Sequence, residues 1–201
     1  MICVDLHLHT QFSFDASIGP KFIVEALNVH PIIKGVAITD HNTLEGYFHV
    51  RRFAAAYEDI VIVPGVEVTT MLGDVIVLGV EEKPAYWSTL ESVVDFAKDR
   101  NGVIVVPHPY RGGGIGDAAK KIPNGLAAVE ILSPDSTALE NKMAETLART
   151  CNMPGVAGSD AHHIHQMWRA YTEINADPNV ESILKAIKEC HVKPVLVKSM
   201  I

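Results

Sequence analysis

The stretch "CVDLHLHTQFSFD", residues 3–15, combines a short apolar strand pattern with histidine and aspartate. Successive side chains of a strand point to opposite faces, so alternation with leucine places Asp5, His7 and His9 on one face. Asp15 follows at a point where this strand would have ended. We therefore expect the strand to bring two imidazoles and a carboxylate to one place.

Apolar segments similar to this first strand recur along the chain and alternate with helical patterns. Each is short and rich in β-branched residues, which is typical of strands buried on both faces. They cover residues 35–39, 60–68, 74–80, 102–107, 127–132, 155–159 and 193–197. The helical patterns cover residues 20–30, 44–57, 89–100, 137–151 and 180–190. The alternation predicts an α/β fold with a largely parallel sheet, which at this length closes more easily into a barrel than into an open sheet.

Length and composition indicate a soluble globular protein that forms one domain over residues 1–201. Apolar residues make up 48% of the chain, charged residues 20%, and the formal net charge is −7. No apolar run is long enough to span a bilayer, and the start lacks the features of a signal peptide, so we expect a cytoplasmic protein without membrane contact. The acidic balance argues against binding to duplex DNA, which needs clustered lysine and arginine.

Histidines and acidic residues collect at the ends of the predicted strands. They are Asp5, His7, His9, Asp40, His41, Glu67, His108, Asp160 and His162. In parallel α/β folds the carboxyl ends of the strands meet at one rim, so these side chains become neighbours. Imidazole and carboxylate are ligands of zinc, manganese and iron, and burying so many ionisable groups without a cation carries a large desolvation cost. The pattern therefore predicts a metal site.

Five motifs also resemble, in order and over nearly the whole chain, those of the PHP superfamily, which is named for polymerases and histidinol phosphatases. The motifs are "DLHLHT", "TDHNT", "PGVEV", "PHP" and "GSDAHH". The chain looks most similar to small stand-alone members described as metal-dependent phosphoesterases. The resemblance implies a distorted seven-stranded β/α barrel of the PHP type. It also implies two or three divalent metal ions (Zn, Mn or Fe) at the C-terminal ends of the strands and hydrolysis of phosphate esters.

The resemblance also implies which residues hold the first two ions. The ligands of the first ion would be His7, His9, Glu67 and Asp160. Glu67 would bridge to a second ion, which His108 would bind. Asp74 stands where family members commonly place another histidine ligand of the second ion. A carboxylate there would favour manganese, magnesium or iron over zinc; alternatively, the second ion is weakly bound or absent.

The third ion would be held by residues from three separate motifs. By resemblance these are Asp15, His41 and His162, with Asp40 either as a further ligand or as a partner that orients His41. Asp40 and His162 are also candidates for the catalytic proton donor to the leaving group, as is metal-bound water. The sequence does not choose among these donors.

Two arginines are candidates for binding the phosphate of a substrate. Arg111 lies in "HPYRGGGIGD", residues 108–117, where glycines let backbone N–H groups approach an anion and the guanidinium can grip phosphate. The alternative is a solvent loop. Arg169 is the second candidate, although a salt bridge inside the fold would explain it equally well. Glu130 has the pattern of an inward-facing strand acid with a structural hydrogen-bond role.

The leading hypothesis is a metal-dependent hydrolase acting on a phosphomonoester or phosphodiester of a small metabolite or nucleotide, through a hydroxide activated by the metal ions. One alternative is a nuclease that trims short single strands, which would need an open groove with aromatic stacking positions. Another is a catalytically silent module that keeps its metals for stability or for docking a partner. The expected partner is a small phosphorylated substrate.

Overall fold

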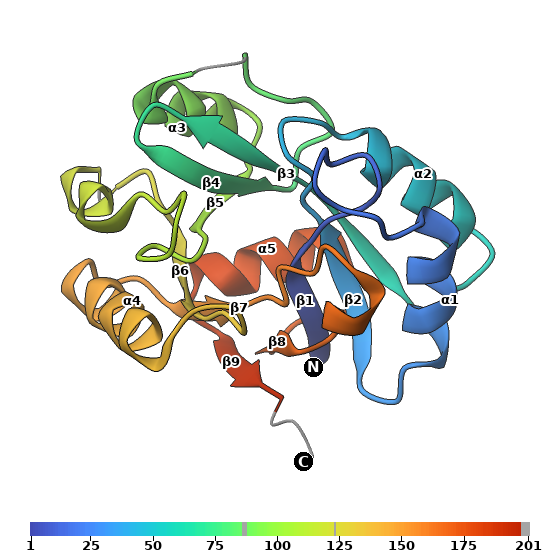
Figure 1. The fold of residues 1–201 in the computed structure, drawn as a ribbon. Coiled ribbons are helices and arrows are strands. Elements are labelled where there is room, and N and C mark those ends of the chain that lie inside the picture. Colours follow the sequence, from blue (N-terminus) through green and yellow to red (C-terminus); the bar gives the residue numbers. More distant parts are fainter. Residues whose placement is uncertain (86–87, 123, 198–201) are drawn as a thin grey trace.

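Strands and helices alternate through the part of the chain that the computed structural model describes, residues 1–85, 88–122 and 124–197 (Figure 1). The strands are β1 (Ile2–Leu8), β2 (Ile33–Ile38), β3 (Val61–Thr70), β4 (Gly73–Leu78), β5 (Val103–Val106), β6 (Ala128–Leu132), β7 (Gly155–Ala157), β8 (Ala170–Ile174) and β9 (Val192–Leu196). The α-helices are α1 (Pro20–Val29), α2 (Glu45–Ala54), α3 (Leu90–Asp99), α4 (Ala138–Thr150) and α5 (Val180–Lys188). Two short 3-10 helices cover Gly116–Lys121 and Ile164–Gln166.

Local sequence explains where the helices begin. Pro20 occupies the first turn of α1, where its missing N–H would have no intrahelical partner. A capping box starts α4, since Thr137 accepts from the backbone of Glu140 and the Glu140 side chain accepts from the backbone of Thr137. Asn179 caps α5 through its side chain. Each predicted helical pattern therefore corresponds to an observed helix.

The strands form one sheet that curves into a nearly closed barrel, in the order β7-β6-β5-β4-β3-β2-β1-β8-β9. The last part of the sheet returns to β7, because the backbone N–H of Ala157 donates to the hydroxyl of Thr172 in β8 at 2.8 Å. An isolated bridge between Leu8 and Ala161 adds to this closure. The predicted α/β barrel is thus confirmed, with nine strands among the described residues where seven were expected.

The sheet is less parallel than the alternation of elements suggests. Four strand pairs are parallel: β1–β2, β2–β3, β5–β6 and β6–β7. Four are antiparallel: β3–β4, β4–β5, β1–β8 and β8–β9. Only Met71 and Leu72 separate β3 from β4, which permits a hairpin but not a parallel crossover of a dozen residues. The short strand β8 was not expected from the sequence.

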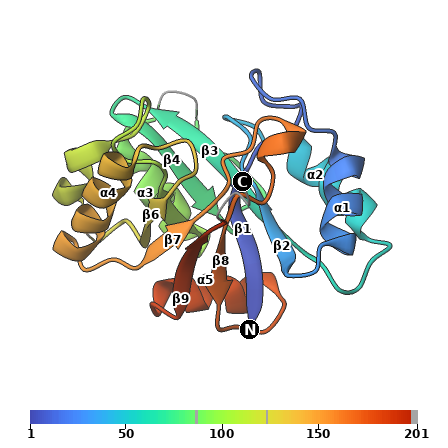
Figure 2. The same ribbon diagram turned by 60° about the horizontal axis from the view of Figure 1, so that its bottom comes forward.

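Two layers of apolar side chains hold the barrel together. The inner layer joins inward-facing strand residues to α5 and includes Leu6, Val63, Ile76, Val105 and Ile187. The outer layer packs the other helices on the sheet and includes Ile23, Val50, Val93 and Leu147. Helices α1 and α2 cover one side of the barrel, α3 and α4 cover the opposite side, and α5 lies across the end near the N-terminus (Figures 1 and 2).

Strand β1 is irregular at its functional end. Its pairing with β2 shifts register between Asp5 and Leu8. Leu6 packs in the inner layer and Leu8 in the outer layer, so the expected strict alternation is broken within this segment.

In the part of the chain that the structure describes, no helix combines the length and the apolar character needed to cross a membrane.

Candidate metal centre

Four side chains at one rim of the barrel place their ligand atoms at the corners of a small polyhedron. Nε2 of His7 lies 3.1 Å from Nε2 of His9, 3.2 Å from Oε2 of Glu67 and 3.1 Å from Oδ1 of Asp160. Nε2 of His9 lies 3.1 Å and 3.3 Å from the same two oxygens. Ligand atoms that surround a zinc ion tetrahedrally at about 2.0 Å are about 3.3 Å apart. The arrangement therefore has the size of a metal-binding tetrahedron.

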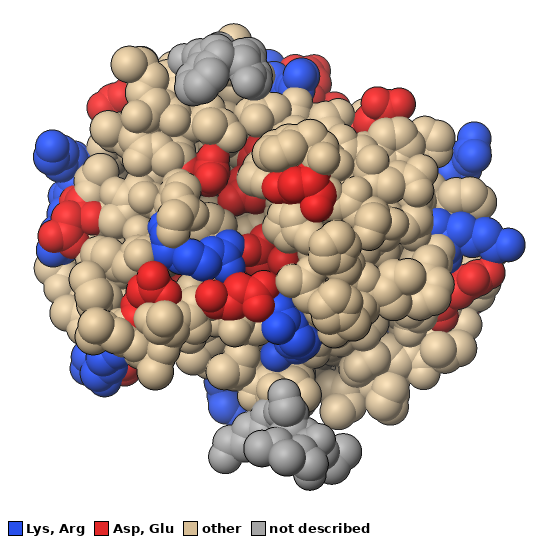
Figure 3. All heavy atoms as spheres, viewed as in Figure 1, with Lys and Arg blue, Asp and Glu red and all other residues tan. Residues whose placement is uncertain are grey.

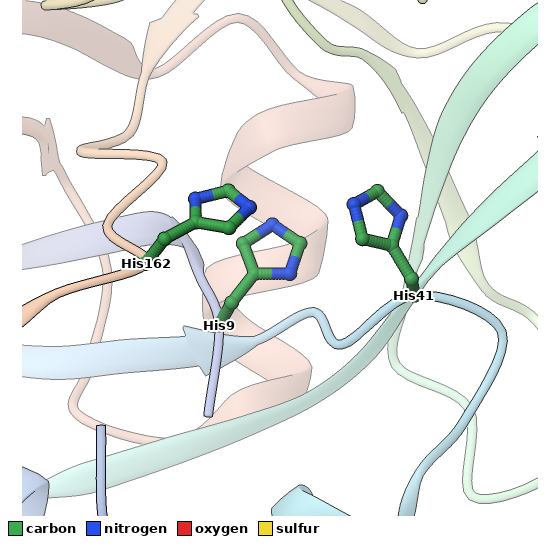
Figure 4. Close-up of side chains that lie close together, drawn as sticks. All are labelled: His9, His41 and His162. Atoms are coloured by element: carbon green, nitrogen blue, oxygen red, sulfur yellow. The ribbon is translucent and has the colours of Figure 1, made fainter. Parts of the chain in front are cut away.

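A second group of imidazoles lies beside the first. Figure 4 shows the rings of His9 and His162 side by side with His41 facing them, and their ligand nitrogens lie within 4.8 Å of one another. Asp15 approaches this group, since its Oδ2 lies 3.5 Å from Nε2 of His41 and 3.4 Å from Nε2 of His162. These residues come from the loops after β1, β2 and β7. Three of the four residues predicted around a third ion, Asp15, His41 and His162, thus lie together with His9.

Glu67 and His108 extend the first group toward a further position. Oε2 of Glu67 faces His7 and His9, whereas Oε1 lies 3.3 Å from Nε2 of His108. Ligand atoms of His7, Glu67, His108 and Asp160 lie within 4.8 Å of one another, and all four side chains are buried. A carboxylate that presents each oxygen to a different imidazole can bridge two ions.

The charges in this cluster raise the pKa values of the imidazoles of His7 and His9 and lower those of the carboxylates of Glu67 and Asp160. Burial alone lowers the pKa of His7, but the carboxylates of Asp160, Glu67 and Glu130 outweigh burial and hold it well above its usual value. The same competition raises the pKa of His9 to about 9. Burial raises the pKa of Glu67 and Asp160, yet the neighbouring imidazoles hold both well below their usual range. The buried carboxylates thus require positive charge beside them.

Unsatisfied polar atoms also fit a bound cation. Oε1 of Glu67 and Oδ1 of Asp160 are buried without a hydrogen-bond partner among the described residues. Buried oxygens of this kind are costly unless they meet a donor or a cation. A divalent ion among imidazoles and carboxylates would satisfy both atoms, and this donor set suits zinc, manganese or iron.

Two of the cluster residues lie on strained backbone. His108, after β5, has a φ of 24°, and Asp160, after β7, has a φ of 50°. Residues other than glycine rarely adopt this left-handed region, and such strain collects at functional sites. The turns after β5 and β7 therefore hold these two side chains over the barrel end.

Glu130 and Asp5 support the ligands from deeper in the barrel. Oε1 of Glu130 lies 3.4 Å from Nδ1 of His7, and Oε2 accepts from the backbone of His108 at 2.9 Å. The structural hydrogen-bond role expected for Glu130 matches these contacts. Asp5 accepts from the backbone of Ser159 at 2.8 Å, and burial raises its pKa to about 7. Asp5 also accepts from the backbone of His7 at 3.3 Å, so it holds both the end of β1 and the segment before Asp160.

Asp40 does not face the metal cluster. Its Oδ1 accepts from the backbone of Thr10 at 2.6 Å and from the Ser13 hydroxyl at 3.1 Å, and its Oδ2 accepts from the Thr10 hydroxyl at 2.7 Å. The side chain is fully buried. Both oxygens of Asp40 thus hold the loop after β1, and Ser13 connects this carboxylate to the backbone of His41, as expected of a partner that supports His41. The roles of ligand and proton donor stay predictions. Sequence reasoning gave no role to Ser13, because a serine in a loop carries no pattern of its own.

Asp74 lies near the cluster but belongs to neither ligand group among the described residues. Its side chain is half-buried, and its backbone N–H donates to the carbonyl oxygen of Gly113 at 2.7 Å. Burial, and then the nearby charge of Glu67, raise the pKa of Asp74. These contacts tie the β3–β4 hairpin to the glycine-rich loop that follows His108.

The two predicted phosphate-binding arginines lie in different surroundings. The guanidinium of Arg111 contacts Oδ2 of Asp160 and lies 3.5 Å from the hydroxyl of Ser133, at the edge of the cluster. The guanidinium of Arg169 instead binds Asp135 at 2.6 Å. Acidic side chains line a hollow in this face of the molecule, and basic side chains border it (Figure 3). Arg111 thus lies at the cluster, paired with one of its carboxylates, whereas Arg169 forms the salt bridge that was the alternative to phosphate binding.

Comparison with known proteins agrees with this architecture. The family described as PHP domain matches residues 5–104, and the family described as PHP-associated matches residues 138–192. The uncharacterized protein MJ1587 of Methanocaldococcus jannaschii is 30% identical over 118 residues, which are 53% of this chain and 67% of that protein. The uncharacterized protein MJ0417 of the same organism is 29% identical over 187 residues, 89% of this chain and 72% of that protein.

Among solved structures, the fold is similar to a two-domain protein from Bacteroides vulgatus described as "containing predicted PHP-like metal-dependent phosphoesterase". The TM-score is 0.83 at 16% identity, over 98% of this chain and 65% of that one. This chain therefore spans slightly less than two thirds of the length of that neighbour. The matched family, the barrel and the cluster at its rim agree, and the chain belongs to the PHP domain family.

Proposed function

We propose that this protein is a metal-dependent phosphoesterase that hydrolyses a phosphomonoester or phosphodiester of a small metabolite or nucleotide. The observation that carries the proposal is the set of distances of 3.1–3.3 Å among the ligand atoms of His7, His9, Glu67 and Asp160. Divalent ions held there would make water nucleophilic near neutral pH and would neutralise charge on a phosphoryl group. We propose two or three ions, because the second imidazole group and His108 offer further positions.

Arg111 is the proposed contact for the phosphate of the substrate. Its guanidinium is about a quarter exposed and reaches the cluster through Asp160. A planar guanidinium can bind two phosphate oxygens at once, which orients the ester for attack. The next residue, Gly112, leaves space beside it, because a Cβ added there would meet nothing within 4 Å.

His162 is proposed as a metal ligand and not as the proton donor. Its Nδ1 lies 2.9 Å from the carbonyl oxygen of Asp160, which can only accept, so Nδ1 carries the proton. Burial and the neighbouring His9 lower the pKa of His162, which favours the neutral ring. Nε2 is then left with a lone pair directed toward Asp15 and the cluster.

The test combines metal analysis of the purified protein with a hydrolysis screen in added Mn²⁺ or Zn²⁺. Substrates are p-nitrophenyl phosphate, bis(p-nitrophenyl) phosphate, nucleoside monophosphates, sugar phosphates and short oligonucleotides. We expect turnover of a small ester, and loss of both metal and turnover in His7→Ala and Glu67→Ala with folding intact. His191→Ala is the matched control, because that imidazole is exposed and pairs only with Glu189 among the described residues.

Two results would contradict the proposal. A fully metallated protein without turnover of any ester would support the silent metal-binding module. Preferred cleavage of oligonucleotides over every small ester would support the nuclease.

A further inference from the structure

The hydroxyl of Ser13 lies at the junction of three buried groups in the loop after β1. Its Oγ is 3.0 Å from Nδ1 of His9 and 3.1 Å from Oδ1 of Asp40. The backbone N–H of His41 donates to the same oxygen at 2.9 Å. The side chains of Ser13, His9 and Asp40 are at most 3% exposed, so solvent does not compete for these bonds.

The proton positions follow from what each neighbour can do. A hydroxyl donates one hydrogen and accepts two, and the N–H of His41 occupies one acceptor position. Oδ1 of Asp40 accepts from the backbone of Thr10, and any proton on this carboxyl would lie on Oδ2 toward the Thr10 hydroxyl. Oδ1 is therefore an acceptor whether or not Asp40 is ionised. The single hydrogen of Ser13 is directed to Asp40.

One acceptor position of Ser13 remains, and Nδ1 of His9 faces it. The proton on this contact must come from His9, because the hydrogen of Ser13 is already used. His9 therefore carries its proton on Nδ1, and its Nε2 presents a lone pair to the cluster formed with His7, Glu67 and Asp160. An imidazole needs this tautomer to ligate a metal through Nε2.

We propose that Ser13, held by Asp40, is a positioning residue that fixes the tautomer and ring orientation of His9 for metal binding. This inference rests on the proposed metal centre and adds to it a residue that touches neither metal nor substrate. Two other ligands have outer partners of different kinds: a carboxylate on Nδ1 of His7 and a backbone carbonyl on Nδ1 of His162. The oxygen of Ser13 also accepts from the backbone of His41, so Ser13 connects His9 to the loop that carries a second proposed ligand.

The experiment measures the affinity of the metal-free protein for Zn²⁺ by competition with a chromophoric chelator. Ser13→Ala should weaken binding by about 10- to 100-fold, the range typical for loss of an outer partner of a ligating histidine. Ser13→Thr, which keeps the hydroxyl, should restore affinity. Ser17→Ala is the matched control in the same loop. Among the described residues its hydroxyl contacts the exposed His163 at 2.9 Å and the backbone carbonyl of His162 at 3.5 Å, but no proposed ligand side chain.

A second measurement begins with the wild type alone, so its first result does not depend on whether Ser13→Ala folds. In ¹H–¹⁵N spectra of the Zn²⁺-loaded wild type, His9 should show an Nδ1–H protected from solvent exchange. Ser13→Ala should lose this protection, while Ser17→Ala should keep it. A wild-type His9 without a protected Nδ1–H would overturn the inference, and so would a Ser13→Ala affinity equal to that of Ser17→Ala.

Failure of the proposed function gives a different result. A wild-type protein that binds no Zn²⁺ would overturn both the metal centre and the role of Ser13. Normal Zn²⁺ binding without any effect of Ser13→Ala would overturn only the role of Ser13.

Discussion

The guanidinium of Arg111 contacts Oδ2 of Asp160, the carboxylate whose Oδ1 lies 3.1 Å from Nε2 of His7. One carboxylate therefore connects the proposed phosphate-binding cation to the proposed metal ligands. Because it neutralises part of the charge on Asp160, Arg111 also keeps the rim less negative where the proposed phosphate ester would enter.

We predict that Arg111→Ala lowers kcat/KM for a phosphate ester by about 10- to 100-fold, since a hydrogen bond to a charged group contributes about 1.5–3 kcal/mol. Metal content should remain, because Arg111 supplies no ligand. Steady-state kinetics and metal analysis check the two parts. Arg149→Ala is the control, as this exposed side chain only approaches Glu145 at 3.9 Å among the described residues. Unchanged kcat/KM in Arg111→Ala would remove this arginine from substrate binding.

Gly46 in α2 lies against the carboxylate of Asp40 and the hydroxyl of Thr10. A Cβ at this position would overlap both side chains, which are fully buried. Gly46→Ala should therefore lower the free energy of unfolding by about 1–3 kcal/mol, the usual cost of overpacking. Gly112→Ala, where a Cβ meets nothing within 4 Å, should change it by less than about 0.5 kcal/mol. Urea denaturation compares the two, and equal stabilities would contradict the tight packing around Asp40.

Hydrophobic pattern was sufficient to predict most of the fold. Runs such as residues 102–107 and 127–132 became β5 and β6 almost at the expected limits, because buried strands need continuous apolar sequence. The rule that strand ends meet at one rim brought Glu67, His108 and Asp160 together from distant parts of the chain. Strand direction was less predictable, since the reversal at β4 depends on a two-residue turn that pattern alone does not distinguish.

Hydrogen-bond partners could not be predicted from the sequence. The pairing of β1 with β2 shifts register between Asp5 and Leu8, and such a shift cannot be read from the residue types of β1 alone. Asp40 follows a strand just as the ligands do, yet its carboxylate is engaged by Thr10 and Ser13. Local backbone geometry decides whether an acidic side chain at the rim faces the cluster or a loop. The residue type alone does not indicate that geometry.

Asp74 offers a direct test of the position where a histidine ligand was expected. Its side chain belongs to neither ligand group among the residues described. Asp74→Asn keeps the size of the side chain and should leave the number of bound Mn²⁺ or Zn²⁺ ions unchanged, as measured by elemental analysis after desalting. Asp74→His should raise zinc content if this position can reach an ion. Loss of one ion in Asp74→Asn would instead make Asp74 a ligand.

The imidazoles and carboxylates of the cluster give the metal-free protein a distinctive pH dependence. The folded-state pKa of His7 is held well above its usual value, and that of His9 is raised to about 9. The folded state therefore binds more protons than the unfolded chain, whose histidines titrate near about 6.5. Stabilisation from these groups is fully present below that pH and is lost as pH rises through the folded-state pKa.

We therefore expect the midpoint of thermal unfolding in EDTA to fall between about pH 6.5 and 9, by on the order of 5 °C. Bound Mn²⁺ or Zn²⁺ should remove this fall, because the ion takes the place of the protons on His7 and His9. Protons compete less with the ion as pH rises, so the metal-bound protein keeps this stabilisation. Differential scanning calorimetry across this range, with and without metal, compares the two states. In His7→Ala, one of the raised groups is gone, so the metal-free fall should be smaller. A metal-free midpoint that rises over this range would show that the cluster does not hold protons in place of the ion.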